Sequence, residues 1–388
     1  MKKILPFLFI ALSLLGETPS QLIESQKSAF EQYKQTQLSG LQKYKEAQAQ
    51  AYEDYKKGIA TVWEEPKMST KKKWLSYSDD KKTRSDVDFE KETITVEAIA
   101  KTPEEAKQKL QIALAKAVTI DTKKAQESDP LEKKLAKIQT PKEIVVADVK
   151  AEPILSTVIF KKKPTKKSVV KYVNKHINKQ TIKVLPSKKI KDAFIYKVKV
   201  NMPKGALYKR SHLYYSEIKK QSNNQGIPLE LTFAIMHTES YFNPRARSLV
   251  PAFGLMQIVP KSAGVDAYFY LYNRKKLVSG SYLYNTTNNI KMGTAYLHLL
   301  YYRYLKKIKN PQSRLYCAIA AYNTGAGNIA YAFTKHYNMN KAAPLINKLT
   351  PDAVYAKLQK DLRYNEPKVY LKNVKQRMKT YHKMYVVR

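Results

Sequence analysis

Apolar residues near the start of the chain recur at the spacing of a helix. From Ser25 to Lys57, aromatic and aliphatic side chains are separated by three, four or multiples of these, within a stretch rich in Gln, Lys, Glu and Ala. This spacing predicts an amphipathic helix that ends before Pro66. Its tyrosine face either packs on its own domain or serves a coiled coil or spacer, and we favour packing.

The pattern then changes from helical spacing to alternation. Apolar residues alternate with polar ones at 87–89 and again at 94–96, and the charged residues 90–92 between them can form a turn. This arrangement predicts a β-hairpin. A helix is expected immediately afterwards, because Thr102 and Glu105 have the spacing of a capping box.

Further strands are predicted before the composition shifts near Pro203. Residues 144–149 and 154–160 are apolar and interrupted by Pro153, and residues 194–200 alternate in a final strand. Residues 121–142 are charged and weakly patterned, which predicts a loop with helical pieces.

After Pro203 no run alternates convincingly as a strand, and the spacing is helical to the end of the chain. A glycine after one helix and a proline at the start of the next mark the boundary at 226–228. The sequence therefore predicts an α+β protein: a smaller N-terminal α+β domain and a mostly α-helical C-terminal domain. The helices expected there cover 211–225, 228–239, 290–305, 315–322 and 353–358.

The first residues have the character of an export signal. Two lysines follow Met1, and an apolar run extends from Ile4 to Leu15. A stable membrane span needs about 20 apolar residues, so this run is short for one. We expect residues 1–19 to be a cleaved signal peptide or an uncleaved membrane tether, residues 20–200 the N-terminal domain, and residues 201–388 the C-terminal domain.

The charge of the chain points to an anionic partner. Lys and Arg number 71 against 32 Asp and Glu, a net charge of +39. Nucleic acid, anionic lipid or a carboxylate-bearing polymer would fit, as would a preference for Lys on solvated faces. The lysine runs at 161–167 and 188–191 lack regularly interleaved aromatic residues, so we expect solvated loops. Export and the absence of a recognisable nucleic-acid module predict no nucleic-acid partner.

Metal and cofactor chemistry is not expected. The six histidines are scattered and form no ligand pair at helical spacing. The glycines at 325–327 follow a helix rather than a strand, which excludes a nucleotide loop of the usual kind. The single cysteine, Cys317, cannot form an intrachain disulfide and lies in an apolar helical run, where a buried thiol is expected.

One acid stands out in the C-terminal half. Glu239 shares a helical face with Leu231 and Ile235, and from Ser240 to Pro351 the one other carboxylate side chain is Asp266. Burial disfavours the charged form and raises the pKa of a carboxyl group, which suits a general acid. A buried glutamate that caps its helix or pairs with a nearby arginine is the alternative.

Neutral hydrogen-bonding residues accompany this acid. Ser248, Gln257, Tyr322 and Asn323 lie in apolar or glycine-containing segments, as in the lining of a sugar-binding cleft. The glycines at 254 and 325–327 would let the backbone approach a ligand closely.

These residues form ordered motifs that resemble a known family. The chain is similar, from about residue 227 to 381, to lytic transglycosylases with a lysozyme-like, soluble-transglycosylase-type domain. Residues 83–85 and 94–97 extend the resemblance to the N-terminal domain of the membrane-bound lytic murein transglycosylase C subfamily. The matching motifs are Glu239-Ser240 with 242–244, 254–258, 321–323 with Gly325, and Glu366 with Tyr370 and Val374.

The resemblance implies non-hydrolytic cleavage of peptidoglycan between N-acetylmuramic acid and N-acetylglucosamine, leaving a 1,6-anhydro end. Glu239 would be the acid and then the base, while the acetamido group of the substrate assists. Among the substrate-binding residues, Ser248 and Gln257 would hold the sugar, Met256 would line the cleft, Tyr322 would orient Glu239 or the acetamido group, Asn323 would contact substrate, and Tyr370 would close the site.

Two rival functions remain at this point. A hydrolytic muramidase ordinarily needs a second carboxylate opposite the acid, and Asp266 is better explained as a helix cap. A non-catalytic peptidoglycan-binding or scaffold protein would keep the fold without needing Glu239. The resemblance also implies a periplasmic location with possible outer or inner membrane association, although no cysteine near the leader could carry a lipid.

Overall fold

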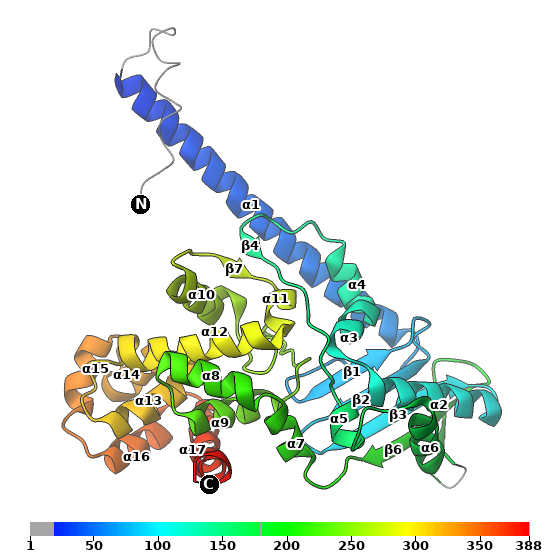
Figure 1. The fold of residues 1–388 in the computed structure, drawn as a ribbon. Coiled ribbons are helices and arrows are strands. Elements are labelled where there is room, and N and C mark those ends of the chain that lie inside the picture. Colours follow the sequence, from blue (N-terminus) through cyan, green and yellow to red (C-terminus); the bar gives the residue numbers. More distant parts are fainter. Residues whose placement is uncertain (1–18, 179–180, 388) are drawn as a thin grey trace.

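The computed structural model describes residues 19–178 and 181–387 (Figure 1). A small antiparallel sheet with covering helices forms the N-terminal half, and helices dominate the C-terminal half, which confirms the predicted α+β class. The expected leader lies outside the described residues, apart from residue 19, and stays a prediction. Across the two described ranges, no helix has both the length and the apolar character needed to cross a membrane.

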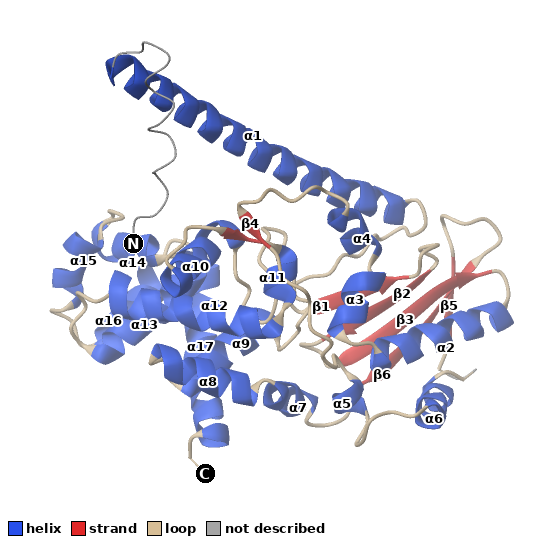
Figure 2. Cartoon of the chain, turned by 45° about the horizontal axis from the view of Figure 1, so that its top comes forward, coloured by secondary structure: helices blue, strands red, loops and turns tan. Residues whose placement is uncertain are grey.

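The first helix, α1 (Pro19–Ala60), points away from the rest of the molecule over much of its length, as Figures 1 and 2 show. Its C-terminal end is buried, because Tyr55 and Ile59 pack with Trp63 against the sheet. Residues 24–29 are exposed. The predicted helix is confirmed, and its tyrosine face packs on its own domain at this end.

The sheet has five antiparallel strands in the order β1-β2-β3-β6-β5. Alternation along each strand divides the side chains between two cores. Trp74 faces the core beneath α2 (Pro103–Thr119), whereas Leu75 faces the core beneath the end of α1. The strands are β1 (Lys73–Tyr77), β2 (Thr83–Asp88), β3 (Thr93–Ala100), β5 (Lys183–Pro186) and β6 (Phe194–Asn201).

The predicted hairpin is confirmed as β2 and β3, and the final strand as β6. The helix after the hairpin is α2, whose Thr102 accepts a hydrogen bond from the Glu105 amide at 3.2 Å. The reciprocal bond of a capping box is not made, because the Glu105 carboxylate accepts from the Lys101 amide instead. Half of the predicted capping box is therefore wrong.

Two strand predictions fail between α2 and β6. Residues 154–160 contain a short helix, α5 (Ser156–Ile159), because Leu155 and Val158 are both buried at helical spacing. The strand expected at 144–149 shrinks to β4 (Ile144–Val145), which pairs in parallel with β7 (Leu277–Val278). The helical pieces expected at 121–142 are α3 (Thr122–Ser128) and α4 (Pro130–Ala136), and the lysine run at 161–167 leads into α6 (Lys166–His176).

The helical half packs around one large apolar core. The helix predicted at 211–225 is broken at Tyr214 into two, and the other expected helices are present. Cys317 is buried, as predicted. The helical elements are α7 (Ala206–Leu213), α8 (Tyr215–Gln225), α9 (Leu229–Ser240), the π-helical turn η2 (Pro260–Gly264), α10 (Val265–Tyr272), α11 (Gly280–Tyr284), α12 (Thr286–His298), the π-helical turn η3 (Leu299–Tyr304), α13 (Pro311–Thr324), α14 (Ala326–Thr334), α15 (Met339–Ile346), α16 (Pro351–Asp361) and α17 (Asn365–Tyr385).

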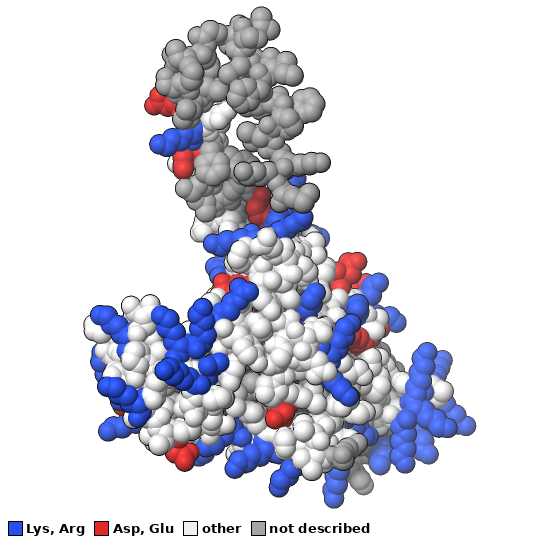
Figure 3. Space-filling view, turned by 60° about the vertical axis from the view of Figure 1, so that its left-hand side comes forward, with Lys and Arg blue, Asp and Glu red and all other residues white. Residues whose placement is uncertain are grey.

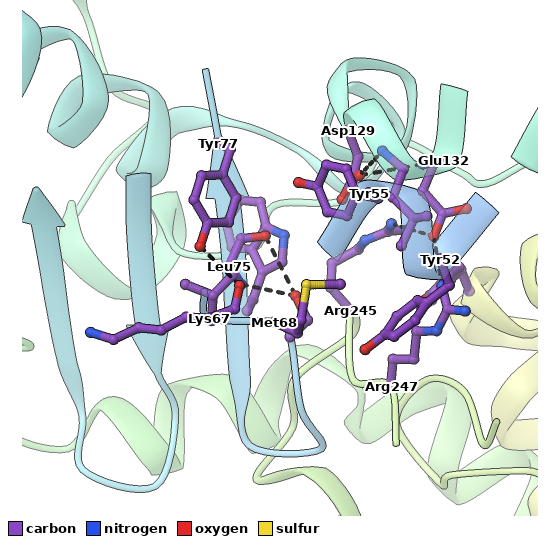
Figure 4. Close-up of a pocket in the computed structure, with 14 residues that line it drawn as sticks. Tyr52, Tyr55, Lys67, Met68, Leu75, Tyr77, Asp129, Glu132, Arg245 and Arg247 are labelled. Atoms are coloured by element: carbon purple, nitrogen blue, oxygen red, sulfur yellow. Dashed lines mark hydrogen bonds and ion pairs between the residues drawn. The ribbon is translucent and has the colours of Figure 1, made fainter. Parts of the chain in front are cut away.

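Charged side chains join the two halves beneath α1 (Figure 4). Arg245 lies 3.6 Å from Glu132 and stacks over the ring of Tyr284 at 3.9 Å. Burial raises the pKa of the neighbouring Asp129 to about 6. The cavity here is about 30 Å³, room for one or two water molecules, and Glu239 does not line it. This seam fixes the halves to each other and is not a substrate cleft.

Candidate active site

Glu239 lies in the last turn of α9, a helix buried on most sides against α8 and α17. The apolar sequence of α9 favours this burial, and Glu239 is 5% exposed. The helix stops where Tyr241 and Phe242 adopt positive φ angles of 53° and 61°. The chain then turns sharply, and the acid sits at the corner.

Two side chains, a tyrosine and a lysine, contact the Glu239 carboxyl group, and a third contacts the same lysine. The Tyr370 hydroxyl on α17 donates a hydrogen bond of 2.7 Å to Oε1. The Lys71 ammonium group, from the segment before β1, lies 3.8 Å from Oε2. The same ammonium lies 3.7 Å from Oε1 of Glu366, in the first turn of α17.

Burial dominates the electrostatics of this acid. Desolvation raises the pKa of Glu239 to about 6, against the lowering effects of Lys71 and the Tyr370 hydrogen bond; Glu366 adds a smaller raising effect. A carboxyl group with this pKa holds its proton in weakly acidic solution and can also release it. These are the properties required of a general acid that later serves as a base.

The loop opposite Glu239 is held by a specific set of hydrogen bonds. Ser240 donates to the Leu255 carbonyl at 2.7 Å, and the Met256 amide donates to Asn289 at 2.8 Å. Gly254 has a φ of +74°, and a Cβ there would overlap the Asn289 amide and the Leu283 carbonyl. The 254–258 loop thus needs glycine at its first position to lie against α11 and α12, while Ser240 ties the loop to the helix of Glu239.

Most of the predicted site residues gather around this loop. Tyr322 on α13 donates to the Met256 carbonyl at 2.8 Å, and burial, with a smaller effect of the negative charge of Glu239, raises the Tyr322 pKa well above its usual value. Asn323 donates to Glu366 at 3.4 Å. Gln257 is buried, donates to the Gly254 carbonyl at 3.0 Å, and has a side-chain oxygen without a hydrogen-bond partner among the described residues.

Two predicted residues lie differently from the rest. Met256 is fully buried, and a Cβ at Gly293 would overlap its sulfur, so its side chain is part of the packing behind the loop. Ser248 hydrogen-bonds the backbone of Val250 and Ala252 within its own loop. It borders a separate groove of about 920 Å³ between α1, α4 and this loop, which Glu239 does not line. Their substrate-binding roles stay predictions.

The alternative role for Glu239, a buried glutamate that caps its helix or pairs with a nearby arginine, does not fit its surroundings. Arg245 and Arg247 pair with Glu132 at the seam instead, at 3.6 and 4.0 Å. The helix cap predicted at Asp266 is wrong: no described side chain caps α10, and Asp266 lies in its first turn and accepts a hydrogen bond from Tyr304 instead. Within the described ranges, Glu239 is therefore paired with a single lysine, Lys71.

Sequence reasoning missed Lys71 and the position of Glu366. Lys71 stands in a run of three lysines, and nothing in the sequence separates it from its neighbours. Glu366 belonged to the fourth motif, but its approach to the same lysine depends on how α17 crosses α9. Pro367 lies in the first turn of α17, where it breaks no helical hydrogen bond. Across the described ranges, no cluster of His, Cys, Asp or Glu could hold a metal ion.

Comparison with known proteins identifies the two halves separately. Residues 216–344 match the Transglycosylase SLT domain, and residues 40–141 match the N-terminal domain of membrane-bound lytic murein transglycosylase C. The solved 70-kDa soluble lytic transglycosylase SLT70 from Escherichia coli is 25% identical and covers 46% of this chain and 26% of that chain. Its TM-score of 0.35 is too low to carry an argument.

Whole-chain relatives join the two halves in one protein. Membrane-bound lytic murein transglycosylase C from Klebsiella pneumoniae (strain 342) is 33% identical over 318 residues, which is 80% of this chain and 82% of the relative. The protein of the same name from Sodalis glossinidius is 40% identical over 189 residues, 49% of this chain and 52% of the relative. The chain therefore belongs to the membrane-bound lytic murein transglycosylase C family.

Proposed function

We propose that this protein is a lytic murein transglycosylase that cleaves peptidoglycan between N-acetylmuramic acid and N-acetylglucosamine and leaves 1,6-anhydro-muramic ends. The observation that carries the proposal is the state of Glu239: a buried carboxyl group with a pKa of about 6, hydrogen-bonded to Tyr370. Family membership supports the same activity and the same substrate.

The proposed reaction needs one carboxyl group used twice. Glu239 gives its proton to the glycosidic oxygen as the bond to the anomeric carbon breaks, and the oxygen keeps the bonding electrons. The acetamido carbonyl of the substrate supports the positive charge on that carbon. The 6-hydroxyl of the same sugar then attacks the carbon and gives its proton to Glu239, so the acid is regenerated and no water is consumed.

The surface charge supports an anionic polymer as substrate. Lys and Arg side chains are spread widely over the face shown in Figure 3, where Asp and Glu are few. Peptidoglycan carries carboxylates on its peptides, and a net charge of +39 would attract it over several ångströms. Encounter would weaken with salt. A periplasmic location, reached by the expected leader, is part of the proposal.

One observation favours a second candidate, a hydrolytic muramidase. Glu366 lies within 4 Å of the same lysine as Glu239, so a second carboxylate does border the acid. Its side chain is 71% exposed and bonded to Asn323, which gives it a weaker claim to activate water than a buried carboxylate would have. The chemical nature of the new chain ends separates the two reactions.

The test is digestion of purified murein by the wild type and by Glu239→Gln, with mass spectrometry of the ends. Wild type should release anhydro-muramic ends, and the variant should be at least about 100-fold slower, the effect of losing a general acid. Glu230→Gln is the matched control, because Glu230 lies on the same helix and pairs with His382 at 3.4 Å. It should retain activity.

Three outcomes would contradict the proposal. Reducing muramic ends that disappear in Glu366→Gln would establish the muramidase. Equal activity of the wild type and Glu239→Gln would remove Glu239 as the acid. Binding of murein without any cleavage would leave a scaffold protein of the same fold.

A further inference from the structure

The segment before the sheet ends in a tight turn with Lys71 at its corner. The Thr70 amide donates to the Lys73 carbonyl at 2.9 Å, and the Thr70 hydroxyl accepts from the amides of Lys72 and Lys73 at 3.3 and 3.2 Å. These bonds fix the backbone of residues 70–73. The backbone position of Lys71 is therefore fixed by hydrogen bonds within the turn.

The same turn is attached to the catalytic half of the chain. Asn243, which is fully buried just after the catalytic helix, donates from its amide side chain to the Lys71 carbonyl at 3.3 Å. The Arg247 amide donates to the Thr70 carbonyl at 3.4 Å. The backbone of Lys71 is thus fixed by the segment that follows Glu239, which sets where its side chain can reach.

A second contact braces the turn from its other side. Lys72 pairs with Glu90 at 2.7 Å, and Tyr241 donates to the same carboxylate oxygen at 2.8 Å. Lys71 has different partners from Lys72. Its ammonium group lies between Glu239 and Glu366, at 3.8 and 3.7 Å.

We propose that Lys71 is a positioning residue for the proposed reaction: its ammonium group stabilises ionised Glu239 after the proton has left and holds Glu366 beside the acid. The N-terminal half would then complete the active site of the C-terminal half. This inference rests on the proposed function, since it assigns Lys71 a part in the proton transfers of Glu239.

The other charged and titratable groups near Glu239 either stay neutral or have partners of their own. Lys71 is the cation in contact with the carboxyl group, and Glu366 adds a negative charge. Tyr370 and Tyr322 stay neutral, because burial raises both of their pKa values well above the usual range. Arg377 on α17 bonds Thr238 and Tyr241 rather than Glu239, and His237 on α9 bonds Tyr381.

The charge of Lys71 acts on both proton transfers. An opposite charge near a carboxyl group lowers its pKa and opposes the effect of burial. Without the ammonium group, Glu239 would hold its proton more tightly and give it up to the glycosidic oxygen less readily. The reaction should then slow, while the pH above which Glu239 loses its proton should rise.

The test compares Lys71→Met with Lys71→Arg in the full-length protein. Titration of the Glu239 carboxyl carbon, followed by NMR with ¹³C-labelled glutamate and assigned by its absence in Glu239→Gln, should move upward by about half a unit or more in Lys71→Met. The alkaline limb of kcat/KM on murein should move in the same direction, with about a 10-fold lower rate at the optimum. In Lys71→Arg, which keeps the positive charge, both the titration of Glu239 and kcat/KM should stay close to the wild-type values.

Lys73→Met is the matched control. It removes the same charge two residues away, where Lys73 pairs with Asp88 at 3.3 Å on the sheet, and should leave the titration of Glu239 unchanged. Lys71→Gln provides a second neutral variant should Lys71→Met fold poorly. A well-folded neutral variant with an unshifted Glu239 titration would overturn the inference.

The inference and the proposed function can fail separately. Anhydro ends from the wild type together with an unshifted Glu239 titration in Lys71→Met would refute the role of Lys71 and leave the transglycosylase in place. Absence of anhydro ends from the wild type would refute the proposed function and, with it, the part of Lys71 in that reaction. In either case, the titration of the Glu239 carboxyl group measures its electrostatic interaction with Lys71.

Discussion

Two buried glutamates, one in each half of the molecule, show how the surroundings of a carboxyl group decide its role. Glu97 in strand β3 and Glu239 in helix α9 are 4% and 5% exposed. Glu97 accepts a hydrogen bond of 2.6 Å from Arg84 and lies within 3.5 Å of two lysines. Glu239 has one lysine at 3.8 Å and a tyrosine hydroxyl.

The difference in partners reverses the direction of the pKa shift. Desolvation is the largest single effect at both sites and raises both pKa values. At Glu97 the arginine and the lysines together outweigh it, so the pKa falls below its ordinary value and the group stays ionised. At Glu239, Lys71 and the hydrogen bond from Tyr370 do not outweigh desolvation, so the pKa rises to about 6. A buried carboxyl group becomes a proton donor only where its charged and hydrogen-bonding partners do not fully offset the effect of desolvation on its pKa.

The largest effect is expected at Glu97. Replacing it by Gln leaves the buried Arg84 guanidinium, 5% exposed, without a charged partner, which should cost about 3 kcal/mol of the free energy of unfolding at neutral pH. Because the folded pKa is lowered, the stabilisation is present above the ordinary pKa and is lost as the pH falls through the folded value. Denaturant unfolding at several pH values measures this.

The control for Glu97→Gln is Glu64→Gln. Glu64 pairs with Lys188 at 2.8 Å, but its side chain is 53% exposed, so the unfolding midpoint should not change. Equal effects of the two substitutions would show that the ion pairs of Glu97 contribute no more to the free energy of unfolding than a surface ion pair. Glu97 would then not be a stabilising buried carboxylate, and its contrast with Glu239 would not hold.

Glu239→Gln should show the opposite dependence of stability on pH. The folded pKa of about 6 lies above the ordinary 4.5, so the native wild type binds its proton more tightly than the unfolded chain. Ionisation therefore destabilises the wild type as the pH rises from 4.5 to 6. The variant, which cannot ionise, should gain about 2 kcal/mol relative to wild type above pH 6 and little at pH 4.

Thermal unfolding of both proteins at pH 4 and pH 7 tests this second prediction. A difference in unfolding temperature that is the same at both pH values would contradict the raised pKa of Glu239. A wild type more stable than Glu239→Gln at pH 7 would show that Lys71 and Tyr370 overcome desolvation, which would make Glu239 a second Glu97.

The fold was predictable where periodicity ran long. The hairpin 87–96 and the helix of Glu239 follow from alternation and from four-residue spacing, and both are present. Short apolar runs next to Pro153 were ambiguous: Leu155 and Val158 satisfy a helix as well as a strand, and packing against α2 and α7 decided for the helix. The parallel pairing of β4 with β7 joins distant segments, which local pattern cannot show.

The acid of the site was predictable and its electrostatic partner was not. Glu239 ends an apolar helix within a long stretch almost free of carboxylates, so its isolation could be seen in the sequence. Lys71 reaches it because the turn before β1 is bonded to Asn243, a contact between segments far apart in the chain. Such a contact has no signature in a run of three lysines.

The smallest effect is expected at Tyr370, whose substitution should make Glu239 still less like Glu97. Tyr370→Phe removes the 2.7 Å hydrogen bond to the acid and keeps the packing of the ring. A hydrogen bond to a charged group contributes about 1.5 kcal/mol, so kcat/KM should fall by about 10-fold. The alkaline limb of the pH profile of kcat/KM should shift upward, because this bond lowers the pKa of Glu239.

Tyr381→Phe is the control for this prediction. Tyr381 lies on the same helix but bonds His237 at 3.1 Å, so the alkaline limb should stay in place. Equal shifts in both variants would mean that a change in helix packing, and not the bond to Glu239, sets the proton affinity of the acid.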